Sequence, residues 1–149
     1  MISSRFAAVF AAATLVFSCS AFAASNNLES ALNSSASLYA QGRFQEAIPH
    51  AKEALAIAGR EMSVEDVAYA EVLDNLAALY EAELDYTEAR PLYRRALDIR
   101  LQKYGPKHPE VVNSLINLAL IYDALGDYSA AQKLDARATV IIEASNRRD

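Results

Sequence analysis

The sequence predicts an all-α fold, an α-solenoid in which three helix-turn-helix repeats stack in a row. The first observation is a repeat: residues 42–47 (GRFQEA) are echoed by residues 84–89 (LDYTEA) and 126–131 (GDYSAA), an offset of 42 each time. The second is that apolar residues within each copy recur at helical spacing. The third is composition, because alanine and leucine are abundant after position 23 while threonine occurs there only twice. Such a composition favours helix over strand.

The 42-residue register extends well beyond these segments. It relates Asn33 to Asn75 and Asn117, Leu38 to Tyr80 and Tyr122, Ala54 to Ala96 and Ala138, and Ile57 to Ile99 and Ile141. So many matches in one register are very improbable by chance. A single two-helix unit cannot bury its apolar face, so the three units are expected to stack. We place the repeats at about residues 28–65, 66–109 and 110–144.

Each repeat is expected to contain a first helix, a short turn and a second helix. In the second repeat, the apolar residues of segment 73–80 lie on one helical face. Gly42 and Gly126 suit the left-handed backbone that often follows a helix end. Leu84 stands at the same place in the second repeat, so its turn is expected to be costlier or differently shaped.

The second helices have their own start signals. Asp85 and Asp127 lie where a side-chain oxygen can cap the following helix. Pro49 and Pro91 fall shortly afterwards, and we expect them early in the helix, where proline is tolerated. The segment 104–109 (YGPKHP) must separate the second repeat from the third.

Small residues predict close packing of the two helices in each repeat. Alanine recurs at positions 47, 89 and 131. The aromatic residues Phe44, Tyr86 and Tyr128 precede these alanines by three positions and are expected to fill the space beside them.

Residues 1–23 have the three-part pattern of a secretory signal peptide. Arg5 precedes an uncharged apolar run too short for a permanent transmembrane helix, and an A-x-A cleavage site ends at Ala23. We therefore expect a protein secreted to the periplasm, with no membrane insertion after cleavage. The alternative is an outer-membrane lipoprotein, because residues 16–19 (VFSC) resemble a bacterial lipobox that would lipidate Cys19.

Composition excludes several functions. The 149 residues include 14 Lys+Arg and 19 Asp+Glu, a net charge of −5 that becomes −6 when Arg5 leaves with the signal peptide. This balance argues against nucleic-acid binding. No cysteine remains after cleavage, two histidines are too few for a His-based metal or proton-shuttle site, and Glu71 with Asp74 gives too few ligands for a metal site. We expect no enzymatic activity, no metal and no cofactor.

The pattern Asn-Leu-Ala-x-x-Tyr at 75–80 and 117–122 resembles the tetratricopeptide repeat. The 42-residue interval and the strings at 88–97 (EARPLYRRAL) and 105–111 (GPKHPEV) resemble the subtype known from kinesin light chains and from many bacterial proteins. The resemblance covers residues 28 to about 142. It implies a right-handed superhelix whose first helices line a concave groove for peptides or protein segments. Such grooves are not usually catalytic.

Two departures from the pattern fall in the outer repeats. Ser34 and Ser35 stand where the second repeat has leucine and alanine, so the first repeat is degenerate. Lys133 and Asp135 stand where the second repeat has proline and tyrosine. We interpret the latter as capping of a chain-end helix, which has no following neighbour to pack against.

The resemblance also implies which residues face the groove. They are Asn33, Tyr39, Glu71, Asp74, Asn75, Ala78, Glu81, Asn113, Asn117, Leu120 and Asp123. Asparagine suits this role because its amide can both donate to and accept from a partner's backbone.

The first helices, taken as 28–41, 64–83 and 110–125, contain nine acidic residues and no lysine or arginine. We therefore expect an acidic, uncompensated groove that binds neutral or basic segments and refuses a C-terminal carboxylate. The alternative function is a self-assembling structural component or an outer-membrane lipoprotein scaffold. A homo-oligomer is a further alternative, because a short solenoid with apolar open ends can stack on itself.

Overall fold

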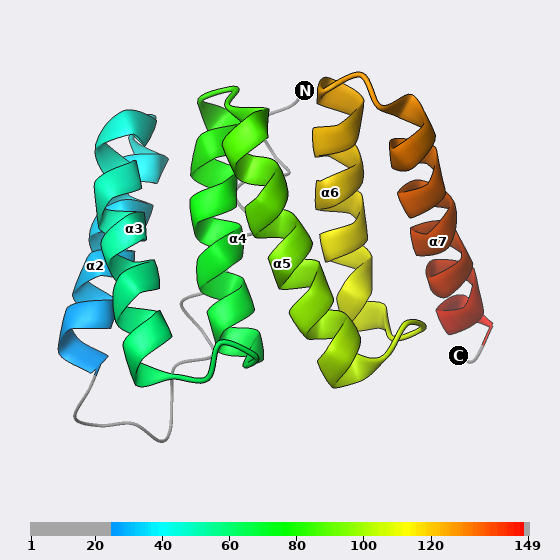
Figure 1. The fold of residues 1–149 in the computed structure, drawn as a ribbon, viewed down its shortest axis with the longest axis horizontal. Helices are drawn as coiled ribbons and strands as arrows, with labels where there is room; N and C mark the ends of the chain where they lie inside the picture. The colour runs from blue at the N-terminus through cyan, green and yellow to red at the C-terminus, as the bar shows by residue number, and fades with distance from the viewer. Residues whose placement is uncertain (1–24, 148–149) are drawn as a thin grey trace.

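The computed structural model of the protein describes residues 25–147, which fold into six α-helices and one short 3₁₀-helix. In chain order these are α2 (Ser25–Ala40), α3 (Phe44–Glu61), α4 (Val67–Ala82), α5 (Tyr86–Tyr104), η1 (Pro109–Val111), α6 (Val112–Ala124) and α7 (Tyr128–Asn146). They form three antiparallel pairs that follow one another across Figure 1. The predicted all-α fold of three helix-turn-helix repeats is confirmed.

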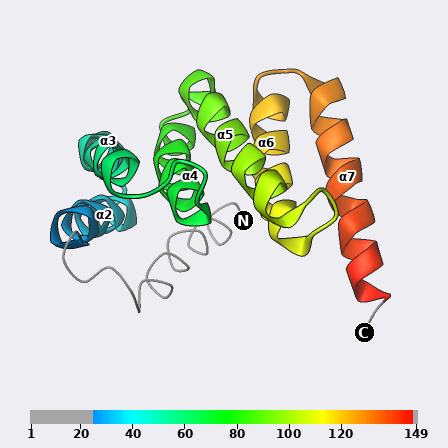
Figure 2. The same cartoon turned by 60° about the horizontal axis from the view of Figure 1, so that its bottom comes forward.

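Consecutive helices pack against each other, both within a pair and between neighbouring pairs. The pairs are rotated relative to one another. In Figure 2, α2 and α3 are seen nearly end-on while α7 is seen from the side. The stack is therefore twisted along its length, as in other repeat proteins where each unit turns slightly against the last.

The three turns inside the repeats share one backbone geometry. Gly42 and Gly126 have φ angles of +73° and +82°, the left-handed conformation that was predicted. Leu84 adopts the same conformation, with φ +62°. Each turn is closed by the same two backbone hydrogen bonds, 2.8 or 2.9 Å long, in the arrangement of a Schellman motif. The leucine turn therefore keeps its shape and carries strain instead.

Two of the second helices have the predicted aspartate caps. The Asp85 carboxylate accepts a hydrogen bond from the Glu88 N–H at 3.3 Å, and that of Asp127 accepts from the Ala130 N–H at 3.0 Å. Arg43 holds this position before α3 and makes no side-chain cap. The second helix of the first repeat therefore begins without the cap that the other two possess.

Pro49 and Pro91 lie inside α3 and α5, and both helices continue through them. Each proline is the sixth residue of its helix, one turn deeper than the first-turn position that tolerates proline best. Its ring removes the hydrogen bond to the carbonyl four residues earlier, on Gln45 or Thr87. Both of those residues are exposed, so water can replace the missing donor.

Alanines let the helices approach closely, as the repeat pattern predicted. Ala47, Ala89, Ala131, Ala54, Ala96 and Ala138 are all buried. The largest apolar cluster joins α4, α5, α6 and α7 and includes Tyr93, Leu97 and Leu115. α4 is packed between α3 and α5, and every residue from 72 to 79 is buried.

Candidate functional site

The predicted groove residues lie on the three first helices, α2, α4 and α6. Their exposure differs sharply. Asn33, Asn113, Leu120 and Asp123 are exposed, Tyr39, Glu71, Glu81 and Asn117 are partly buried, and Asp74, Asn75 and Ala78 are buried. We call the accessible part of this surface the first-helix face. Most of it belongs to α2 and α6, and α4 adds the partly buried Glu71 and Glu81.

Asp74 is not the uncompensated acid that the sequence predicted. Its Oδ2 atom lies 2.6 Å from Nη2 of Arg100 on α5, and both side chains are nearly buried. Nη1 of the same guanidinium donates to the Ser114 hydroxyl on α6 at 2.7 Å. Burial raises the pKa of the Asp74 carboxyl, and the Arg100 charge opposes that rise. The arrangement ties three helices together, and it removes Asp74 from direct contact with a partner.

Arg100 was not among the predicted site residues because its charge does not recur in the repeat. At the offset of 42, Arg100 corresponds to Ala58 and Ile142, so a charge appears there in only one repeat. Asp74 is likewise unique among its equivalents, which are Leu32 and Ile116. Both charges occur only in the second repeat, where the other repeats have apolar residues. This shared departure from the repeat pattern is the feature from which the ion pair could have been predicted.

Glu81 forms a second polar contact between α4 and α5. Its Oε2 atom accepts a hydrogen bond from the Tyr93 hydroxyl at 2.8 Å. Burial raises the pKa of Glu81, while the bond from Tyr93 opposes the rise. Burial also raises the pKa of Tyr39 on α2, and the nearby charge of Glu81 adds to that effect. Glu81 therefore lies where the first two repeats meet, within the electrostatic reach of both tyrosines.

The first-helix face remains acidic after these contacts are taken into account. α2, α4 and α6 contain no lysine or arginine. Burial raises the pKa of Glu71, and Arg100 is the charge that opposes this rise. Asp123 is exposed at the end of α6. The prediction of an uncompensated face is thus wrong at Asp74, where Arg100 balances the charge.

The described part of the chain, residues 25–147, has no group of three or more His, Cys, Asp or Glu side chains that could hold a metal ion. His108 has a structural role: its Nδ1 accepts from the Glu110 N–H at 3.2 Å, and its ring stacks on Tyr104 with centroids 4.9 Å apart. Among the same residues, no helix is long and apolar enough to cross a membrane. The predicted signal peptide, its cleavage at Ala23 and the alternative lipidation of Cys19 lie outside the described residues.

Sequence comparison agrees with this architecture. The sequence profile of the tetratricopeptide repeat matches residues 26–102 and again residues 69–143. These matches cover most of the chain, so the protein belongs to the tetratricopeptide repeat family. Repeats of this family generally form protein–protein interaction modules and are typically non-catalytic. No curated protein matches the chain.

Two solved structures have a similar fold. BtubC (BKLC) from P. vanneervenii is 31% identical over 76% of this chain, with a TM-score of 0.69. The match covers 46% of BtubC, so this chain corresponds to less than half of that protein. The tetratricopeptide repeat domain of Arabidopsis FLU is 20% identical over 81% of this chain and 98% of its own length, with a TM-score of 0.68. At that identity the likeness to FLU concerns the fold alone.

Proposed function

We propose that this protein is a non-catalytic binding module that holds a neutral or basic peptide or protein segment against the first-helix face. The observation that carries the proposal is the charge of this face. Its three helices lack lysine and arginine, whereas Glu71 and Glu81 are partly accessible and Asp123 is exposed. A partner's lysine or arginine would be attracted there, and a carboxylate would be repelled.

Accessible asparagines supply the second element of the proposal. Asn33, Asn113 and Asn117 have at least partly exposed side chains on α2 and α6. Each amide can donate to a backbone carbonyl and accept from a backbone N–H, so it can hold an extended segment of any sequence. Asn75 is buried, and in this conformation it supports packing instead of touching a partner.

We also propose the 42-residue, kinesin-light-chain-like subtype and a role in the bacterial cell envelope. The subtype is supported by the offset of 42, which relates all three turns. The location is supported by the signal-peptide pattern of residues 1–23. Mass spectrometry of the mature amino terminus tests the location: Ala24 as first residue indicates the periplasm, and a diacylated Cys19 indicates a lipoprotein.

Surface plasmon resonance with synthetic peptides tests the binding proposal. Three amidated peptides would differ only in carrying lysine, serine or glutamate at alternate positions, and a fourth would be the glutamate peptide with a free carboxyl end. We expect the lysine peptide to bind best, and we expect its affinity to fall as added salt screens the charges of the first-helix face. The combined variant Glu71→Gln and Asp123→Asn should bind it about fivefold more weakly, as expected for two partly exposed charges.

The matched control changes two exposed acids on second helices, Glu53→Gln on α3 and Glu143→Gln on α7. It alters the net charge equally and should leave the affinity unchanged. Best binding by the glutamate peptide with a free carboxyl end would refute the proposal. The alternative function, self-assembly through the ends of the stack, predicts instead an oligomer whose size grows with concentration in light scattering.

A further inference from the structure

The turn between α4 and α5 contains a leucine that the fold does not favour. Leu84 has φ +62°, where the equivalent turns have Gly42 and Gly126. A side chain other than glycine is strained in this conformation. The leucine gains little from packing in return, because its side chain is 70% exposed. Neither the backbone nor the core explains a large apolar residue at this position.

An open hollow of about 450 Å³ lies beside this turn. It is lined by Gln45 and Ile48 of α3, Tyr80 of α4, and Glu83 and Asp85, which flank Leu84 in the chain. Ile48 and Tyr80 supply apolar surface, and Glu83 and Asp85 supply two carboxylates. No lysine or arginine lines the hollow. The Lys52 ammonium lies over the Tyr80 ring, 5.6 Å from its centroid.

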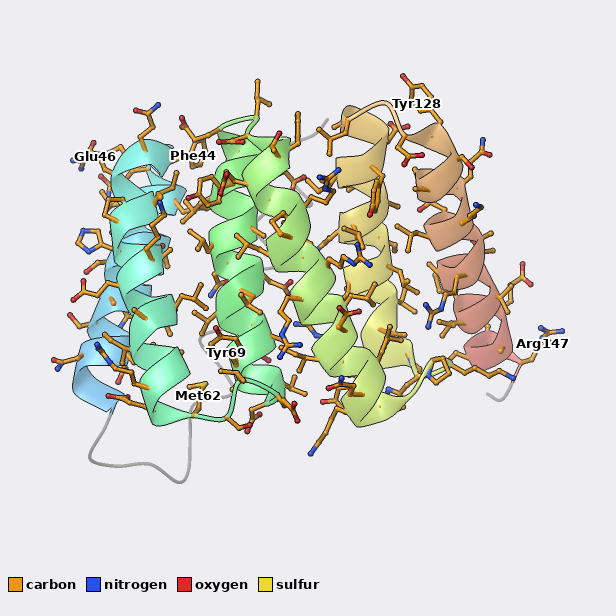
Figure 3. The ribbon with its side chains drawn as sticks, in the orientation of Figure 1. Phe44, Glu46, Met62, Tyr69, Tyr128 and Arg147 are labelled. Atoms are coloured by element: carbon orange, nitrogen blue, oxygen red, sulfur yellow. The ribbon has the colours of Figure 1, made fainter. Side chains whose placement is uncertain are left out.

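The hollow and the leucine lie on the edge of the stack that carries all three turns inside the repeats, at the top of Figure 1. Tyr128 projects outward from the same edge at the start of α7 (Figure 3) and is 62% exposed. An exposed apolar side chain beside a concave surface that combines apolar and acidic side chains can form an interaction site. This edge differs from the first-helix face, because Leu84 and the flanking residues belong to a turn.

We propose that the α4–α5 turn is a second docking surface, which takes a partner segment with an apolar side chain next to basic ones. The apolar side chain would contact Leu84, Ile48 and Tyr80. The basic side chains would be attracted by the two carboxylates of the hollow, Glu83 and Asp85. The strain at Leu84 is then retained because binding requires an apolar side chain there.

The probe is a soluble, acetylated and amidated peptide in which Lys-Leu-Lys stands in a glycine and serine frame, with Glu-Leu-Glu as its counterpart. Both are titrated into the ¹⁵N-labelled protein. We expect the Lys-Leu-Lys peptide to shift the amide signals of Gln45, Ile48 and residues 80–86, and the Glu-Leu-Glu peptide to leave them in place. Shifts confined to Asn33, Asn113 and Asn117, or equal shifts with both peptides, would overturn the proposal. The position of the shifts also separates this surface from the first-helix face.

Substitutions at one position separate strain from binding. Leu84→Gly should raise the thermal midpoint by about 4 °C, because it restores the residue of the other turns. The same variant should bind the Lys-Leu-Lys peptide with about tenfold lower affinity. Leu84→Ala keeps the backbone strain but removes most of the apolar side chain. The affinity for the Lys-Leu-Lys peptide should therefore fall, and the thermal midpoint should not rise. Leu84→Met should keep the affinity. A Leu84→Gly variant that binds as tightly as the parent overturns the proposal. It is also overturned if light scattering finds a dimer for the parent and a monomer for Leu84→Ala.

Discussion

Glu81 is a partly buried carboxyl group with one hydrogen-bond donor beside it. Its carboxylate accepts from the Tyr93 hydroxyl at 2.8 Å. Burial, together with the charge of Glu81, raises the pKa of Tyr93 well above its usual range. Tyr93 therefore stays protonated at neutral pH and remains a donor. Burial raises the pKa of Glu81 itself, which makes this residue sensitive to pH.

The sign of the pH effect follows from that raised pKa. The folded protein binds the proton of Glu81 more tightly than the unfolded chain does, whose ordinary value is 4.5. The free energy of unfolding should therefore fall as pH rises from 4.5 through the folded pKa. Glu71 and Asp74, whose pKa values burial also raises, act in the same direction. Urea denaturation at a series of pH values measures the slope.

Two variants isolate the contribution of Glu81. Glu81→Gln keeps an acceptor for Tyr93 and removes the titration, so its slope should be shallower than that of the parent. Tyr93→Phe leaves the carboxylate without its donor, so stability at pH 7 should fall by about 2 kcal/mol. Glu46, whose pKa its bond from Arg43 lowers, acts in the opposite sense and is common to all three proteins. An unchanged slope in Glu81→Gln would show that other groups cause the pH dependence.

At the scale of the helices, Arg100 makes a buried polar contact between the second repeat and the third, whereas the bond from Arg137 to the Pro106 carbonyl is exposed. The guanidinium binds Asp74 of α4 and Ser114 of α6 at once. Oδ1 of Asp74 is buried and has no hydrogen-bond partner among the described residues. A carboxylate in that position depends on its one cation, because the interior offers it no water.

Arg100→Ala should therefore be strongly destabilising, by about 3 kcal/mol, because it leaves the Asp74 charge buried and unpaired. Arg94→Ala is the matched control, since Arg94 is an exposed arginine on the same helix, and it should change stability by less than about 0.5 kcal/mol. The triple variant Asp74→Ile, Arg100→Ile and Ser114→Val installs residues that equivalent positions of other repeats carry. Chemical denaturation should show that it recovers most of the loss. Equal effects of Arg100→Ala and Arg94→Ala would contradict this account.

The same contrast explains how far the sequence could predict the structure. The helices, the left-handed turns and the caps of Asp85 and Asp127 depend on neighbours in the chain, and the repeat displays each signal more than once. The Arg100 contact joins three helices through residues that do not repeat, so no local sequence pattern predicts it. The burial of Asn75 could not be predicted for the same reason, because it depends on how α4 packs between α3 and α5.

Tyr128 shows the limit of extrapolating from one repeat to the next. Phe44 packs against a cluster formed by Ala47 and Ala51 of α3 with Leu76 and Leu79 of α4, and Tyr86 packs against the core that α6 shares. Each of these rings thus packs against a cluster that includes residues of the repeat that follows it. Tyr128 was expected to fill the space beside its alanine in the same way, yet it is 62% exposed. No helix follows α7 within the described residues, so its ring lacks the surface that the other two cover.

At the scale of the whole molecule, two sets of positions on the outer faces of the stack are polar where the equivalent inner positions are apolar, although Ile142 of α7 is 41% exposed. Val72, Leu76 and Leu79 pack α4 against α3, and at the offset of 42 the corresponding residues of α2 are Ser30, Ser34 and Ser37. Tyr93, Leu97 and Leu101 join α5 to the core that α6 shares. The corresponding residues of α7 are Asp135, Thr139 and Glu143, all exposed. The serine at position 34 that made the first repeat look degenerate therefore belongs to a polar end face.

Polar end faces should keep the stack from adding copies of itself, because terminal repeats need a solvated outer surface. We expect the purified protein to scatter light as a monomer at all concentrations. Restoring the inner residues at both ends, with Ser30→Val, Ser34→Leu and Ser37→Leu on α2 and Asp135→Tyr, Thr139→Leu and Glu143→Leu on α7, should create two complementary apolar faces. These faces meet head to tail, and such contacts do not close on themselves, so the particle size should grow with concentration. Each single-end triple variant is the matched control and should grow far less, since its exposed face meets a polar one. A combined variant that stays monomeric would show that the serines and acids of the outer faces are not what limits the stack to three repeats.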